Sequence, residues 1–105
     1  MFFELRQYRT KPGQRDNWVQ FMEEVVIPYQ VSKGMIVVGS FVGEQEDDLY
    51  IWIRRFESEE ERERLYKAVY ESDYWKSLNP QIEEMLDRQS IVVTRIVPTP
   101  RSIIR

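Results

Sequence analysis

Two segments of the chain, residues 2–10 and 48–56, alternate between aliphatic side chains and side chains that are charged or aromatic. Because successive side chains of a strand point to opposite faces, this period of two predicts two β-strands, each with one aliphatic face. Their other faces carry charged and aromatic residues: Glu4, Arg6, Tyr8, Tyr50, Trp52 and Arg54. An aliphatic face suits packing on helices, so the charged and aromatic faces are predicted to meet a binding cavity, a subunit interface, or both.

The segment between these strands predicts a helix and a further strand. Residues 14–33 carry an apolar stripe at helical spacing: Trp18, Phe21, Met22, Val25 and Tyr29. Pro28 is expected to kink this helix or to end its regular part near Ile27, because proline lacks an amide donor and clashes with the preceding turn. Residues 35–43 predict a strand in which Gly39 indicates a bulge, and the acidic loop 44–48 makes a hairpin with the next strand.

The second half repeats the order of helix and strand. Ser58 is predicted to be a helix N-cap, with Glu61 completing a capping box, and the helix is expected to run to about Glu71. Its predicted inner stripe is Leu65, Ala68, Val69 and Ser72. Asp73 is expected to be the N-cap of a further helical segment. Asn79-Pro80 then restarts a helix to about residue 88, and residues 90–97 predict the last strand.

The order β-α-β-β-α-β indicates a single α+β domain over residues 1–105, of the ferredoxin-like type. Such a domain has a four-stranded antiparallel sheet with its helices on one face. The face with Glu4, Arg6, Tyr8, Tyr50, Trp52 and Arg54 is predicted to be the bare one. Two such sheets packed face to face would close a dimeric barrel with a cavity between sheet and partner.

The composition limits the chemistry. The chain has no Cys and no His, which excludes Cys/His zinc sites, a His-ligated haem and a Ser-His-Asp triad. No metal site or cofactor is therefore predicted. The net charge of −3 is unfavourable for binding nucleic acid, and no apolar run approaches the roughly 18 residues of a membrane span. The N-terminus lacks the apolar core of a signal peptide, so a cytoplasmic location is expected.

Several motifs, taken in order, resemble the NIPSNAP family. They are Phe-Glu-Leu-Arg-Gln-Tyr-Arg-Thr-Lys-Pro-Gly at residues 3–13, Tyr-Ile-Trp at 50–52, Asp-Tyr-Trp at 73–75 and Arg-Ile-Val-Pro-Thr-Pro at 95–100. The resemblance covers essentially the whole chain and implies a dimeric α+β barrel. That architecture is shared with cofactor-free monooxygenases, lactone isomerases and haem-handling proteins. No defined reaction comes with the NIPSNAP name itself, and the lack of His argues against the haem-handling mode.

Glu4, Arg6 and Arg54 form the sharpest site hypothesis. If the two alternating strands are neighbours, these side chains lie within cross-strand reach, and a guanidinium is then available to grip a carboxylate or enolate. The alternative is a structural ladder of ion pairs that bridges two subunits. Tyr8, Tyr50 and Trp52 are predicted to line the same space and orient a planar ligand, or else to pack in a dimer interface.

These alternatives lead to different functions. The first is a homodimer with a cavity for an acidic or aromatic metabolite, which binds, senses or transforms it. The second is an interaction module whose sheet face serves only dimerisation. A cofactor-free monooxygenase or isomerase is a further alternative. The sequence assigns no catalytic residue, and it leaves open whether the protein is an enzyme.

Overall fold

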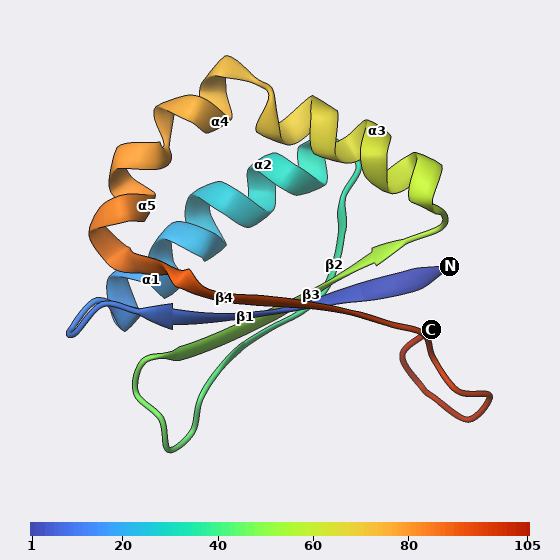
Figure 1. The fold of residues 1–105 in the computed structure, drawn as a ribbon, viewed down its shortest axis with the longest axis horizontal. Coiled ribbons are helices and arrows are strands. Elements are labelled where there is room, and N and C mark those ends of the chain that lie inside the picture. Colours follow the sequence, from blue (N-terminus) through green and yellow to red (C-terminus); the bar gives the residue numbers. More distant parts are fainter.

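The sheet has four antiparallel strands in the order β2-β3-β1-β4, which confirms the predicted fold class (Figure 1). The computed structural model describes residues 1–105. The strands are β1 (Phe2–Thr10), β2 (Ile36–Val42), β3 (Leu49–Phe56) and β4 (Leu86–Ile96). The register of β2 against β3 shifts between Val37 and Gly39, at the position where the glycine predicted a bulge. β4 begins at Leu86, four residues before its predicted start.

The first helical segment runs without a break past the predicted kink. It consists of α1 (Arg15–Phe21), a π-helical turn η1 (Met22–Val26) and α2 (Ile27–Ser32). The wider turn lies directly before Pro28, where an α-helix would need an amide that proline does not have. The helix therefore accommodates the proline by widening one turn, and it ends only at Ser32.

This π-turn changes which residues face the sheet. The predicted stripe holds for Trp18, Phe21 and Met22, but beyond them Val26 and Gln30 are buried, at 1% and 0% exposure, in place of Val25 and Tyr29. A π-helix has more than 3.6 residues per turn, so one turn of it advances the inward-facing position by about one residue. As a result, a polar side chain, Gln30, is directed into the interior.

The second helical layer forms an arch of three helices: α3 (Glu59–Tyr70), α4 (Asp73–Ser77) and α5 (Asn79–Met85) (Figure 1). Ser58 caps α3 as predicted, accepting a hydrogen bond from the Glu61 amide at 3.1 Å. Ser72, not Asp73, caps α4: its hydroxyl accepts from the Trp75 amide at 3.1 Å. In the predicted stripe of α3, Leu65 and Val69 are buried, whereas Ala68 is exposed.

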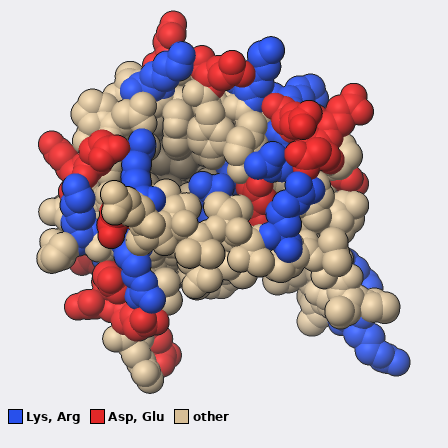
Figure 2. All heavy atoms as spheres, in the orientation of Figure 1, with Lys and Arg blue, Asp and Glu red and all other residues tan.

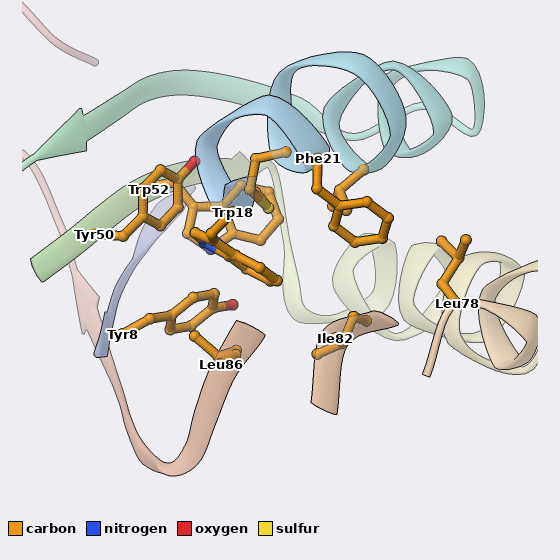
Figure 3. Close-up of a cluster of buried hydrophobic side chains, with 10 residues drawn as sticks. Tyr8, Trp18, Phe21, Tyr50, Trp52, Leu78, Ile82 and Leu86 are labelled. Atoms are coloured by element: carbon orange, nitrogen blue, oxygen red, sulfur yellow. The ribbon is translucent and has the colours of Figure 1, made fainter. Parts of the chain in front are cut away.

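The main core lies between the helices and the sheet (Figure 3). It joins residues from both layers: Tyr8, Trp18, Phe21, Met22, Val26, Tyr50, Trp52, Leu78, Ile82 and Leu86. Tyr8 lies between strand and helix neighbours, with ring centroids 5.9 Å from Trp18 and 6.1 Å from Tyr50. No helix in the structure combines the length and the apolar character that a membrane span requires.

The predicted assignment of the two sheet faces is wrong. Glu4, Tyr8, Tyr50, Trp52 and Arg54 are each at most 5% exposed, and they pack beneath the helices. The open face, on the other side of the sheet, carries mainly aliphatic and aromatic residues, namely Leu5, Ile36, Phe41, Ile51, Ile53, Val92 and Ile96, together with Gln7, Arg9, Arg55 and Thr94. Strand alternation separates two faces but does not say which one the helices cover. The helices cover the polar face because they supply partners for its charges.

Candidate functional site

An ion pair between two neighbouring strands lies at the centre of the polar face. Glu4 on β1 is directly opposite Arg54 on β3, and Arg54 Nη2 donates to Glu4 Oε1 at 2.8 Å. Both side chains have 0% exposure. The cross-strand contact predicted from the sequence is therefore present. It lies within one chain and beneath the helices, and not between two subunits.

Nearly all of the hydrogen-bond donors of Arg54 are bonded to other groups of the protein. Nη1 donates to Gln30 Oε1 at 2.8 Å and to the Tyr70 hydroxyl at 2.7 Å, and Nη2 also donates to the Tyr66 hydroxyl at 2.8 Å. Only Nε has no partner. A buried guanidinium with its terminal donors satisfied in this way holds strands and helices together. It has little left with which to bind a ligand directly.

Both carboxylate oxygens of Glu4 also have hydrogen-bond partners. Its Oε1 accepts from the Tyr66 hydroxyl at 2.7 Å, and its Oε2 accepts from Arg62 Nε at 2.6 Å. Burial disfavours the ionised carboxylate. The hydrogen bonds from Arg62 and Tyr66 and the charge of Arg54 outweigh that effect and lower the pKa of Glu4. Burial raises the pKa of the Tyr66 phenol to about 12, and its donation to Glu4 acts in the same direction.

Four members of this network were not identified from the sequence: Gln30, Arg62, Tyr66 and Tyr70. Three of them lie four residues apart along α3, so they form a second stripe beside the apolar one. From the sequence alone, the spacing of Arg62, Tyr66 and Tyr70 could have predicted a polar helix face directed at the sheet. Gln30 gave no comparable signal, because it reaches the network through the π-turn.

Arg6 keeps a free donor although most of its side chain is buried. Its Nε donates to the Tyr8 hydroxyl at 2.7 Å, and its Nη1 donates to the Tyr66 hydroxyl at 3.2 Å. Its Nη2 makes no hydrogen bond to the protein and is not among the buried unpaired atoms. The Arg6 side chain is 15% exposed, against 0% for Glu4. One edge of this guanidinium therefore reaches solvent.

A hollow opens under the arch of α3, α4 and α5. Figure 2 shows it between these helices and the sheet, with a basic side chain at its lower edge. Val93 lies opposite Arg6 in the pairing of β1 with β4 and is 44% exposed, so no helix covers the sheet edge at this point. The rings of Tyr66, Tyr70 and Trp75 follow one another on the helix side, with successive centroids 4.9 Å apart.

The structure thus divides the six predicted residues into three groups. Glu4 and Arg54 are enclosed in the ion-pair network, and Tyr8, Tyr50 and Trp52 belong to the main core. Of the six, only Arg6 keeps an unused donor that reaches solvent. A cation next to aromatic rings is suited to an anionic ligand with a planar or apolar body.

Comparison with known proteins agrees with this fold. The family model described as NIPSNAP matches residues 3–102. A NIPSNAP family protein with unknown function from Agrobacterium tumefaciens superimposes with a TM-score of 0.89 at 24% identity, covering 100% of this chain and 94% of that one. A second NIPSNAP family protein from the same organism gives a TM-score of 0.86 at 22% identity, covering 99% of this chain and 98% of the other.

More distant structures share the architecture. An antibiotic biosynthesis monooxygenase superimposes with a TM-score of 0.68 at 16% identity, covering 95% of this chain and 100% of that one. At this identity the likeness concerns the fold alone. No curated protein is similar enough to count as a relative.

The Glu4–Arg54 pair makes a strong prediction for stability. Glu4→Gln leaves Arg54 buried with no counter-charge, and we expect it to lower the free energy of unfolding by about 3–5 kcal/mol. Urea denaturation of the purified variant measures this. Glu59→Gln, which removes an exposed partner of Arg62 and Arg95, is the matched control and should change stability by less than about 1 kcal/mol. Equal effects of the two substitutions would contradict the central role of Glu4.

The lowered pKa of Glu4 also predicts a dependence of stability on pH. A carboxyl whose pKa is lower in the folded state contributes stability above its unfolded pKa, near 4.5, and that contribution is lost as the pH falls through the folded value. The free energy of unfolding should therefore fall more steeply for the wild type than for Glu4→Gln between about pH 5 and 3. Parallel pH profiles for the two proteins would show that Glu4 titrates normally.

Proposed function

Because the chain belongs to the NIPSNAP family, we propose that it acts as a homodimer in which each subunit binds a small anionic metabolite with an aromatic or apolar body. The ligand occupies the hollow under α3, α4 and α5, and its anionic group binds Arg6. The observation that carries this proposal is the unused Nη2 of Arg6 at the edge of the polar network, on a side chain that is only 15% exposed.

In this proposal the six predicted residues have different roles. Arg6 contacts the ligand, and Tyr8 fixes the guanidinium plane through its bond to Nε. Glu4 and Arg54 hold Tyr66, which accepts from Arg6, and so position Arg6 indirectly. Tyr50 and Trp52 belong to the main core, at 1% and 2% exposure, and do not contact the ligand. This moves the proposed cavity from between two subunits into each subunit.

The open face supports the homodimer. Phe41 and Val92 are about half exposed, at 51% and 52%, and Ile36 and Ile96 are 46% and 40% exposed. A sheet face of this kind is favourable to bury against a second copy, and a twofold axis lets the same surface serve both subunits. A cytoplasmic location is part of the proposal, and the lack of Cys is compatible with a reducing compartment.

The interaction module remains the second candidate, because a saturated ion-pair network is what a purely structural role requires. The monooxygenase fold of a distant neighbour is compatible with catalysis in the hollow. Binding at Arg6 is the property that separates the first candidate from the second.

Ile51 provides a test of the dimer. It lies on the open face, opposite Phe41 on β2 and Gln7 on β1. We expect Ile51→Lys to shift the solution mass from dimer to monomer in light scattering at low micromolar concentration, because burying an unpaired ammonium in an apolar interface is unfavourable. Val31→Lys, on α2 and 50% exposed, is the control and should remain dimeric. A wild-type monomer would contradict the proposal.

Arg6 provides a test of ligand binding with a defined probe. The aromatic sulfonate 1-anilinonaphthalene-8-sulfonate is followed by fluorescence, next to N-phenyl-1-naphthylamine, which has the same ring system without the charge. Arg6→Gln should weaken binding of the sulfonate about tenfold to a hundredfold, as expected for the loss of a hydrogen bond to a charged group, and leave the neutral probe unaffected. Arg64→Gln, exposed on α3, is the control. Unchanged sulfonate affinity in Arg6→Gln would disprove the site.

A further inference from the structure

Two projections extend from the sheet on the side away from the helices (Figure 1). One is the tip of the β2–β3 hairpin, here the acidic hairpin, which carries Glu44, Glu46, Asp47 and Asp48. The other is residues 97–105, here the basic hook, which carries Arg101 and Arg105. The hook is closed on itself, since the Ser102 amide donates to the Thr99 carbonyl and Arg105 donates to the Pro100 carbonyl, both at 3.0 Å.

The two projections differ in charge and lie at opposite ends of the molecule. Figure 2 shows acidic side chains on the lower left projection and basic side chains on the lower right one. Within the hairpin, Glu46 and Asp48 each pair with Arg9 at 2.9 Å. Glu44 and Asp47 form no ion pair, and neither do Arg101 and Arg105. Each projection thus keeps two charges without a partner.

We propose that in the homodimer the acidic hairpin of each subunit binds the basic hook of the other, so that two charged contacts flank the buried open faces. This contact rests on the homodimer of the proposed function. It adds the charged residues by which one subunit recognises the second. A twofold axis parallel to the sheet and perpendicular to the line between the projections places hairpin against hook at both ends. An axis along that line would instead bring like charges together, so the charges select the first arrangement.

An apolar groove at the base of the hook supports the same arrangement. It has a volume of about 230 Å³ and lies between the hook and the open face, lined by Phe3, Ile53, Ile96, Val97, Pro98, Thr99, Ser102 and Ile104. This is below the roughly 300–1,000 Å³ of ligand sites, and it suits a side chain. Phe41, 51% exposed, precedes the acidic hairpin by only a few residues. A hairpin docked on the hook brings Phe41 of the partner subunit to this groove.

Charge reversal tests the contact with residues that have no ion pair inside the subunit. The hairpin variant combines Glu44→Lys with Asp47→Lys, and the hook variant combines Arg101→Glu with Arg105→Glu. In a homodimer of either variant the contacts become repulsive, and the dimer dissociation constant should rise about tenfold or more. When the two variants are mixed, both contacts become attractive again. Native mass spectrometry should then show heterodimers well above the random half.

A control separates this contact from overall charge. Glu63→Lys with Glu84→Lys, on helix surfaces, gives the same net charge as the hairpin variant, since −3 + 4 = +1 in both. Mixed with the hook variant, it should not give preferential heterodimers. Random mixing of hairpin and hook variants that remain dimeric would overturn the proposed contact and leave the homodimer intact. A monomeric wild type would overturn both.

Discussion

The buried ion pair between Glu4 and Arg54 is the constraint on which the rest of the structure depends. Two unit charges without solvent exposure are unfavourable unless nearly every donor and acceptor around them is paired. The helices must therefore bring polar side chains down to the sheet. Gln30 comes from α2, and Tyr66 and Tyr70 come from α3, so the pair ties both helical layers to the centre of the sheet.

This requirement explains features that lie far apart in the sequence. The π-turn before Pro28 rotates Gln30 inward, where its amide oxygen meets Arg54. Arg62, Tyr66 and Tyr70 follow one another at four-residue spacing on α3 and direct a polar stripe at the same point. It also explains why the aliphatic side of the sheet is left open, because the sheet has only one face that the helices cover.

The two faces of the sheet have different roles in the proposed function. The covered face is filled by the network and the main core, and the proposed ligand site lies where a donor of Arg6 reaches solvent. The open face has only ion pairs near its margins, those of Arg9 and Arg55, and its ends carry the acidic hairpin and the basic hook. Ligand binding and dimerisation are thus assigned to opposite sides of one sheet. A ligand in the hollow would not compete with a second subunit.

The sequence by itself determined the order of strands and helices, the antiparallel α+β class, the bulge at Gly39 and the cap at Ser58, because these depend on local periodicity and on the conformational preferences of single residues. It also predicted that Glu4, Arg6 and Arg54 lie within cross-strand reach if their strands are neighbours, and the structure supplies the register that puts Glu4 opposite Arg54. Only the tertiary structure decided which face the helices cover. That choice depends on partners from distant helices, such as Tyr66, Tyr70 and a Gln30 turned inward by a π-turn, and no local pattern in the strands contains them.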